Sequence, residues 1–245
     1  MAENEKPFFL LFLKKEQLTS DCYTFFFKRT PESPEFTPGQ YFEIKMDIKN
    51  PDERGDAHVF TISSSPLDRE FYTITTRIIQ SSFKLRLADL QPGELVQFDG
   101  PWNDFNFDEH DTSPHVFLAG GIGITPYHSI VKYAMEKNLT TQMILFVSWK
   151  NRDEMIFDDF FRQANNHMDN FTYVPTLTDE SQNPSEWDGE IGRINEVMIR
   201  KYISSILDAK YYFSGPPVMV SALKETVKGM SVPSEKTIFE EFEGY

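Results

Sequence analysis

An apolar run that ends in a cluster of glycines constrains this chain more than any other stretch. Residues 115–119 have the length and composition of a buried strand, and a glycine-rich turn follows at residues 120–123. Glycine lets the backbone turn sharply and leaves no side chain in the way of a ligand. Thr125 is the predicted N-cap of the helix that follows, Pro126 suits the first helical position, and Asn138 can end the helix. The stretch therefore predicts a strand–turn–helix unit.

The start of such a helix favours an anionic diphosphate, because its free N–H groups and positive dipole end point at the ligand. The spacing Gly121-x-Gly123-x-x-Pro126 is a broken form of the dinucleotide fingerprint, since proline stands where a third glycine is usual. Two interpretations stay open at this point: a nucleotide-binding turn, or a turn that joins a strand to a helix and binds nothing.

From about Pro114 onward, predicted strands alternate with predicted helices. The strands are expected at residues 115–119, 143–149, 171–177, 210–214 and 236–240. The helices are expected near residues 126–137, 153–164, 195–206 and 217–228. This alternation predicts right-handed crossovers and a Rossmann-like α/β domain, in which helices cover both faces of a parallel sheet.

The chain up to about Asp108 is built of short strands instead. They are rich in β-branched and aromatic residues, are separated by turns containing proline or glycine, and are expected at residues 8–14, 22–28, 41–46, 59–62, 71–79 and 95–99. Residues 82–90 have the one helical pattern there. Such a succession predicts an antiparallel β-barrel or sandwich. We expect a first domain at residues 1–108 and a second at 109–245, with the acidic segment 102–113 as linker.

Charge and cysteine content exclude several classes of function. A formal net charge of −14 disfavours nucleic acid and anionic membranes as partners. One cysteine, Cys22, can form neither a disulfide framework nor a cysteine-ligated cluster or zinc site, so we interpret it as a packed thiol. The polar N-terminus and the lack of a long apolar run predict no signal peptide and no membrane span, and the expected location is cytoplasmic.

Five further motifs occur in a fixed order along the two halves. They are His58–Pro66, Thr73–Arg77, Ser81–Lys84, Phe213–Pro217 and Glu243–Tyr245. Together with the glycine turn, they resemble the ferredoxin–NADP reductase family of flavoproteins over nearly the whole chain. The resemblance implies a flavin-binding antiparallel β-barrel domain followed by an NAD(P)-binding α/β domain.

For the barrel half, the resemblance implies specific contacts to FAD. The ring of Phe60 would lie against the isoalloxazine, and the hydroxyl of Thr61 could donate to flavin N5. His58 stands where the family has arginine, and histidine is often neutral at pH 7, so the usual clamp on a flavin phosphate changes. Ser81–Lys84 matches the second flavin motif with its glycine lost; its hydroxyls, N–H groups and lysine are expected to bind the pyrophosphate, although both serines also suit plain capping.

For the α/β half, the resemblance implies NADPH as co-substrate. Ser148 and Lys150, with Arg152 in support, would hold the 2′-phosphate, whereas an NADH-binding site usually has an acidic residue at this strand end. Thr125 would lie close to both flavin and nicotinamide, and Ser214 replaces the family's cysteine beside the nicotinamide.

The predicted site residues fall into two groups. Those expected to act in catalysis are Thr61, Ser214, Glu243 and Tyr245. Those expected to bind flavin or nucleotide are His58, Val59, Phe60, Thr61, Thr75, Thr76, Arg77, Ser81, Ser82, Phe83, Lys84, Gly121, Gly123, Thr125, Pro126, Ser148, Lys150, Arg152, Thr178, Ser214, Gly215, Pro216, Phe242 and Tyr245. Tyr245 and Phe242 compete as the terminal ring that stacks on the flavin, and no metal site is expected.

These features predict a flavin-dependent oxidoreductase that passes a hydride between NAD(P)H and bound FAD, and electrons on to a separate acceptor. FMN and NADH remain alternatives, the acceptor is a small redox protein or another electron carrier, and a monomer or homodimer is expected. The replacements at His58 and Ser214 motivate a second hypothesis, a non-catalytic flavin- or nucleotide-binding subunit of a larger electron-transfer complex. An iron–sulfur subunit would need a cysteine cluster.

Overall fold

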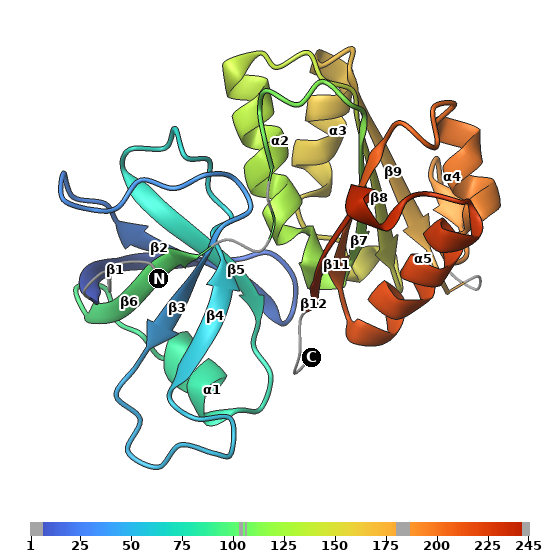
Figure 1. Ribbon diagram of the computed structural model, residues 1–245. Helices are drawn as coiled ribbons and strands as arrows, with labels where there is room; N and C mark the ends of the chain where they lie inside the picture. Colours follow the sequence, from blue (N-terminus) through green and yellow to red (C-terminus); the bar gives the residue numbers. More distant parts are fainter. Residues whose placement is uncertain (1–6, 103–104, 106, 180–186, 242–245) are drawn as a thin grey trace.

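Two sheets, one antiparallel and one parallel, organise the chain (Figure 1). The computed structural model describes residues 7–102, 105, 107–179 and 187–241. The predicted fold class is confirmed: a barrel-like antiparallel half precedes an α/β half. Among the described residues, no helix combines the length and apolar composition needed to cross a membrane.

The antiparallel half is a six-stranded sheet in the order β4-β3-β6-β1-β2-β5. Its elements are β1 (Phe8–Gln17), β2 (Cys22–Lys28), β3 (Tyr41–Lys45), β4 (Ala57–Thr61), β5 (Phe71–Arg77), α1 (Ser82–Ala88) and β6 (Leu95–Trp102). A bridge between Ile62 and Ile74 brings the two edges together, so the sheet curls toward a closed barrel.

Aromatic side chains fill the barrel, because alternate residues of each strand point inward. The rings of Phe27, Phe42 and Phe98 are fully buried. Phe98 packs edge-on against the other two, with ring centroids 4.9 Å from Phe27 and 5.5 Å from Phe42. The high phenylalanine content of the first half is therefore used for core packing.

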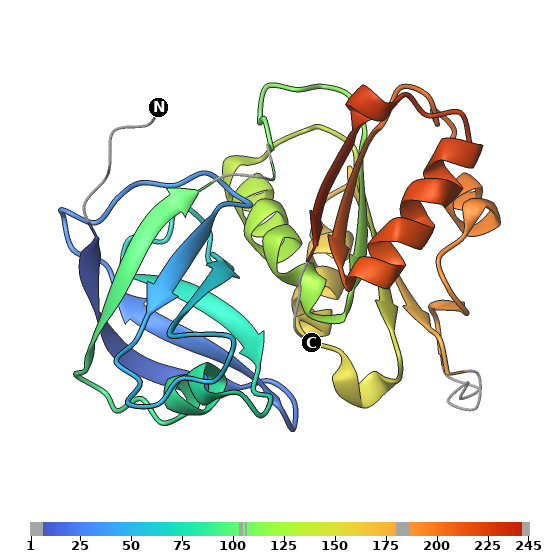
Figure 2. The same cartoon turned by 60° about the horizontal axis from the view of Figure 1, so that its bottom comes forward.

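The second half is a parallel sheet in the order β10-β9-β8-β7-β11-β12. Its strands are β7 (His115–Gly120), β8 (Met143–Trp149), β9 (Phe171–Leu177), β10 (Glu190–Ile191), β11 (Lys210–Gly215) and β12 (Thr237–Glu241). Its helices are α2 (Thr125–Lys137), α3 (Asp158–His167), α4 (Glu196–Tyr202) and α5 (Pro217–Gly229), with 3₁₀ turns η1 (Gly121–Ile124), η2 (Arg152–Glu154) and η4 (Ser234–Lys236). Helices α2 and α3 cover one face, and α4 and α5 cover the other (Figures 1 and 2).

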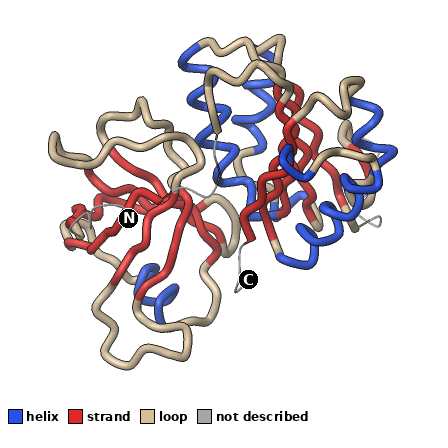
Figure 3. Tube along the Cα trace, viewed as in Figure 1, coloured by secondary structure: helices blue, strands red, loops and turns tan. Residues whose placement is uncertain are grey.

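Helix α2 lies between the parallel sheet and the barrel (Figures 2 and 3). Part of the predicted linker also joins the second core. Phe105 is fully buried, with its ring 5.5 Å from Tyr127 and 5.4 Å from Tyr212. The boundary at residues 108/109 remains our proposal.

The structure corrects two predicted helix starts. Thr125 is not an N-cap: η1 runs directly into α2, and the Thr125 hydroxyl donates to the carbonyl of Ile122 instead of accepting a backbone N–H. The helix expected from residue 153 begins at Asp158, because Phe157 before it has a left-handed backbone with φ of 59°. Asn138 does end α2, in the left-handed conformation that asparagine tolerates.

Candidate nucleotide and flavin site

A cavity of about 450 Å³ opens at the carboxyl ends of the parallel strands. Its wall includes Gly121 from the glycine turn, Ser148 near the end of β8 and Lys150 after it, Thr178 after β9 and Pro216 after β11. The structure thus brings together predicted nucleotide residues from four separate segments. This edge of an open α/β sheet is where ligands bind in such folds.

The glycines of the turn have different tasks. A Cβ on Gly123 would lie 2.3 Å from the carbonyl oxygen of Ser214, so this glycine allows η1 to approach β11. A Cβ on Gly120 would lie 2.4 Å from the Met219 sulfur. Gly121 has φ of 52°, lines the cavity and has open space where a Cβ would stand. Close packing therefore explains why Gly120 and Gly123 are glycines, whereas Gly121 leaves room for a ligand in the cavity.

Positive side chains dominate the polar wall of the cavity. Lys150 and Arg193 contribute two cations. Arg77, from the end of β5 in the barrel, contributes a third and forms ion pairs with Glu154 at 3.0 Å and with Asp21 at 3.7 Å. With Glu154 also in the wall, three cations face one carboxylate, which suits a ligand that carries phosphates.

Arg152 lies elsewhere than predicted. Its guanidinium stacks over the ring of Trp187 at 5.1 Å and lines a second, shallower hollow beside α3. The 3₁₀ turn η2, which begins at Arg152, turns this side chain away from Ser148 and Lys150. The predicted support of a 2′-phosphate by Arg152 is therefore corrected, and Arg193 is the second cation in the cavity wall.

Three predicted flavin or nicotinamide contacts carry buried polar atoms without a hydrogen-bond partner among the described residues. They are His58 Nε2, Thr61 Oγ1 and Ser214 Oγ. Burying a polar group without a partner is costly, and a bound flavin or nicotinamide that reached these atoms would complete their bonding. The turn η1 packs against both β5 and β11, which connects the barrel motif to the Ser214 segment. These donors and acceptors fit a flavin held between the halves.

The surroundings of His58 keep its imidazole neutral. Its ring centroid lies 4.4 Å from that of Phe83. Burial, and then the positive charge of Lys84, lower the pKa of His58. The replacement of arginine by histidine therefore removes a fixed positive charge from this position, as the sequence suggested.

Lys84 points into the barrel and not toward the start of α1. Its ammonium donates to the hydroxyl of Thr76 and lies 4.5 Å from the centre of the Phe60 ring, which also stacks on Phe83 at 5.7 Å. Burial lowers the pKa of Lys84 to about 7. The expectation that Lys84 adds charge at the helix start is corrected, because the first turn of α1 directs this side chain inward.

The start of α1 already holds an anion from the chain itself. The backbone N–H of Ser82 donates to the carboxylate of Asp52 at 2.9 Å, and the Ser82 hydroxyl accepts from the Asp52 N–H. The bonds from Ser82 and Arg54 lower the pKa of Asp52 to about 2. Ser81 acts as a plain N-cap that accepts from the N–H of Lys84 at 3.1 Å. The predicted pyrophosphate contacts of both serines are therefore replaced by internal ones.

The remaining predicted residues take varied places. The side chain of Val59 is 58% exposed on the face of β4 opposite Phe60, so it is directed away from the barrel interior. The Thr75 hydroxyl is bonded to Thr24 and Ser63, and the Thr76 hydroxyl accepts from Lys84. The buried residues Thr125, Pro126 and Gly215 lie in or beside the glycine turn without lining the cavity. Phe242, Glu243 and Tyr245 lie outside the described residues.

The cavity wall also contains residues that were not among the predicted site residues, and three of them bear on its chemistry or shape. Glu154 and Arg193 carry charge into it, and Met219 packs over Gly120. Arg193 follows the short strand β10, and an acidic residue after β8 is a known signal for ribose binding. No sequence pattern distinguishes Met219 from an ordinary core methionine.

Comparison with known proteins agrees with this geometry. Residues 117–225 match the family model described as oxidoreductase NAD-binding domain. The chain is 27% identical over 222 residues to one subunit of the Na(+)-translocating NADH-quinone reductase of Klebsiella pneumoniae, covering 83% of this chain and 52% of that protein. It is 26% identical over 216 residues to the propane 2-monooxygenase reductase component of Rhodococcus jostii, covering 86% and 57%. The chain thus spans about half the length of these curated relatives.

The fold has a full-length counterpart among solved structures. A ferredoxin NADP+ reductase from Neisseria gonorrhoeae with bound FAD and NADP superposes with a TM-score of 0.80 at 21% identity, covering 97% of this chain and 99% of that one. The match to the NAD-binding model, the two related reductases and the shared two-domain architecture agree with the motif order. Residues 117–225 of this chain therefore form an oxidoreductase NAD-binding domain, and the chain as a whole has the two-domain fold of the ferredoxin NADP+ reductase to which it is similar.

Proposed function

We propose that this protein is an FAD-dependent NAD(P)H oxidoreductase that delivers electrons to a separate acceptor. The observation that carries the proposal is the set of unpartnered buried atoms on His58, Thr61 and Ser214, which come from both halves of the chain. The cationic cavity, whose wall includes Gly121 and Ile122 of η1, supplies a matching place for the nicotinamide nucleotide.

The residues of the chain bind and orient, and when bound the flavin supplies the hydride-accepting chemistry. The Thr61 hydroxyl and the His58 imidazole complete their hydrogen bonds on the flavin, and Ser214 completes its own beside the nicotinamide. Gly121 leaves room for the diphosphate, while Lys150, Arg193 and Arg77 neutralise its charge. The barrel and α/β walls exclude water from the space where the two rings meet.

We propose NADPH as the preferred co-substrate. The hydroxyl of Ser148 and the cations of Lys150 and Arg193 suit a 2′-phosphate, and Glu154 in the same wall is already paired with Arg77. One relative is named for NADH and one structural neighbour contains NADP. Stopped-flow reduction with each nucleotide tests the preference: we expect at least tenfold tighter binding of NADPH, and equal or weaker binding would contradict it.

The acceptor is proposed to be an electron-carrier protein or an oxygenase component, as the name of the propane 2-monooxygenase reductase component suggests for that relative. The net charge of −14 favours a neutral or basic partner over an acidic one at low salt.

A second candidate is a flavin- or nucleotide-binding subunit without turnover. It is favoured by the internal contacts of Asp52 with Ser82 and of Lys84 with Phe60, which occupy positions expected to serve the flavin. Purification with FAD followed by anaerobic addition of NADPH separates the candidates. We expect a yellow protein whose oxidised-flavin absorbance disappears within seconds; a yellow protein that resists bleaching by both nucleotides supports the second candidate, and failure to bind FAD or FMN excludes the first.

A further inference from the structure

The turn that follows β4, residues Ser63–Ser65, is fully buried and held from the barrel side by β5. The Ser63 hydroxyl lies 2.8 Å from the Thr73 hydroxyl and 3.0 Å from that of Thr75. The Ser64 hydroxyl accepts from the Thr73 N–H at 3.1 Å. These bonds leave the backbone carbonyls of Ser63 and Ser64 available to the neighbouring domain.

Helix α2 binds this turn from the other side. His128 Nδ1 lies 2.7 Å from the carbonyl oxygen of Ser63, and the Ser129 hydroxyl donates to the carbonyl of Ser64 at 2.6 Å. The Ser65 hydroxyl donates to the carboxylate of Glu136, which lies about two turns further along α2. We name these three bonds between α2 and the turn the serine clamp.

The His128 ring is fixed in place by aromatic neighbours. It stacks on Phe157 with centroids 4.0 Å apart and lies 4.5 Å from the ring of Phe160. Because a carbonyl can only accept, Nδ1 must carry the proton that it donates to Ser63. Desolvation lowers the pKa of His128 to about 4, so the imidazole is neutral at pH 7. Phe157 holds this position with a left-handed backbone, a strained conformation for a bulky residue.

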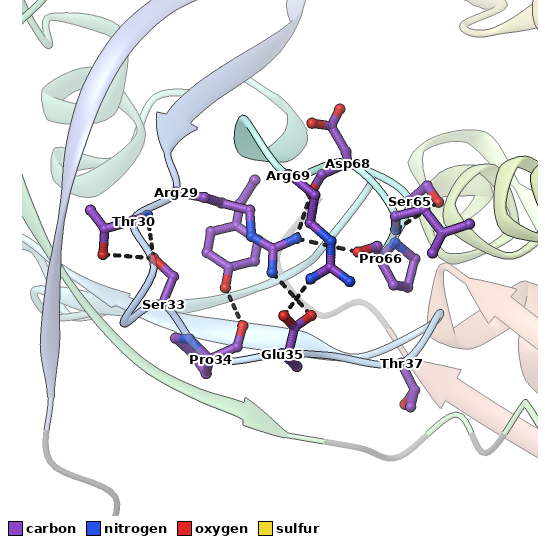
Figure 4. Close-up of polar contacts among 12 residues, drawn as sticks. Arg29, Thr30, Ser33, Pro34, Glu35, Thr37, Ser65, Pro66, Asp68 and Arg69 are labelled. Atoms are coloured by element: carbon purple, nitrogen blue, oxygen red, sulfur yellow. Dashed lines mark hydrogen bonds and ion pairs between the residues drawn. The ribbon is translucent and has the colours of Figure 1, made fainter.

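The loop after the turn is anchored in the barrel by a buried arginine (Figure 4). Arg29 donates to the carbonyls of Pro66 at 3.3 Å and Asp68 at 2.5 Å, and its guanidinium lies 4.7 Å from the Tyr72 ring. Asp68 in turn faces Lys132 of α2 at 3.9 Å. The serine clamp therefore joins α2 to a turn whose following loop is itself anchored in the barrel.

Each side of the clamp is close in the chain to a residue that the proposed function places in a binding site. Thr61, with its unpartnered buried hydroxyl, is two residues before Ser63. Gly121, which lines the nucleotide cavity, begins the 3₁₀ turn that continues into α2. The register of α2 against Ser63–Ser65 thus sets the separation between the two sites.

We propose that His128 and Ser129 are positioning residues that hold the nicotinamide and flavin sites at the separation needed for hydride transfer. This inference rests on the proposed function. The side chains of His128 and Ser129 do not line the nucleotide cavity. Loss of the clamp should therefore lower the rate of flavin reduction without changing nucleotide binding. Misplacement of reacting atoms by about 1 Å can cost on the order of a hundredfold in rate.

The test compares His128→Leu, which removes the donor but keeps apolar volume between the phenylalanines, with His128→Asn, whose amide can replace the Nδ1 donor. Ser129→Ala removes the second donor. Tyr133→Phe is the matched control, because it removes one hydroxyl of the same helix that bonds Glu109 and not the barrel. Stopped-flow spectroscopy measures the limiting rate of flavin reduction, the nucleotide dissociation constant and the charge-transfer absorbance between the two rings.

We expect His128→Leu and Ser129→Ala to lower the limiting rate at least tenfold and to weaken the charge-transfer absorbance. FAD content and the nucleotide dissociation constant should change less than twofold, and His128→Asn and Tyr133→Phe should remain near wild type. Wild-type rates and absorbance in both clamp variants would overturn the proposal, as would a loss confined to nucleotide binding.

A second measurement keeps the inference separate from the proposed function. Small-angle X-ray scattering of the protein without nucleotide should show a larger radius of gyration for a His128→Leu/Ser129→Ala double variant than for Tyr133→Phe. If neither nucleotide reduces the flavin of the wild-type protein, the proposed function fails. An unchanged radius of gyration in the double variant would, independently of that result, overturn the role of the clamp in holding the two halves together.

Discussion

Arg77 of the barrel and Glu154 of the α/β half form an ion pair, Nη2 to carboxylate 3.0 Å, within the wall of the nucleotide cavity. The pair joins the two halves and sets the charge that an incoming phosphate meets. Both side chains are partly exposed, so the pair itself adds little to stability. We therefore expect this ion pair to influence the affinity for the nucleotide and not the stability of the fold.

Variants of this pair should change nucleotide affinity in opposite directions. Glu154→Gln removes the one carboxylate that the described residues contribute to the cavity wall and frees Arg77, so NADPH should bind about threefold to tenfold tighter at low salt. Arg77→Gln leaves Glu154 uncompensated and should weaken binding by a similar factor. Fluorescence titration at two salt concentrations measures both effects. Shifts in the same direction for the two variants would show that the pair serves only to join the domains.

Two glycines of one turn should respond differently to alanine. Gly123→Ala places a methyl group 2.3 Å from the Ser214 carbonyl and should destabilise the fold by about 2–4 kcal/mol. Gly121→Ala should cost about 1 kcal/mol for its left-handed backbone but fill space that we assign to the diphosphate. Thermal unfolding and NADPH titration separate these effects. If Gly121→Ala bound NADPH as tightly as wild type, the diphosphate could not lie on this turn.

Thr61 and Thr75 offer a matched pair of buried hydroxyls in the barrel. Thr61→Ala removes a hydroxyl without a partner in the described part of the chain, so stability should change by less than about 0.5 kcal/mol, while flavin reduction slows at least tenfold. Thr75→Ala breaks bonds to Thr24 and Ser63 and should destabilise by about 1–2 kcal/mol. Urea unfolding and stopped-flow reduction measure the two quantities. Unchanged hydride transfer in Thr61→Ala would refute the contact to flavin N5.

His115 should make the fold sensitive to acid. It is fully buried beside the rings of Phe107 and Tyr212, and desolvation lowers its pKa to about 4. Because the folded pKa lies below the unfolded value of about 6.5, the unfolded chain binds the proton first. Stability is therefore complete above pH 6.5 and falls as the pH drops toward 4, by about 2 kcal/mol at pH 5.

The comparison of wild type with His115→Phe isolates this contribution, since phenylalanine fits the aromatic surroundings and cannot titrate. Urea midpoints at pH 7 and pH 5 should differ less in the variant than in wild type. An equal loss of stability in both proteins would assign the acid sensitivity to other groups, of which His128 is the first candidate because its pKa is also lowered to about 4.

The sequence alone determined the order of elements and the division into two unlike halves. The strand at residues 143–149 and the glycine turn before α2 follow from local periodicity and backbone preference, which depend on neighbours a few residues away. Motif order indicated the two-domain reductase fold because it compares many positions at once. Ser148, Lys150 and Thr178 were predicted to meet, and they share one cavity wall, because strand ends of a parallel sheet converge at one edge.

Only the tertiary structure decided where single side chains of these motifs point. Lys84 turns into the barrel toward Thr76, Asp52 occupies the start of α1, and Arg152 stacks on Trp187. Each of these outcomes depends on a contact with a residue distant in the chain or in another element, and sequence spacing carries no information about such contacts. The serine clamp could not be predicted from the sequence for the same reason. His128 is an ordinary polar residue of a helix in the sequence, and its partner Ser63 is known only from the packing of α2 against the barrel.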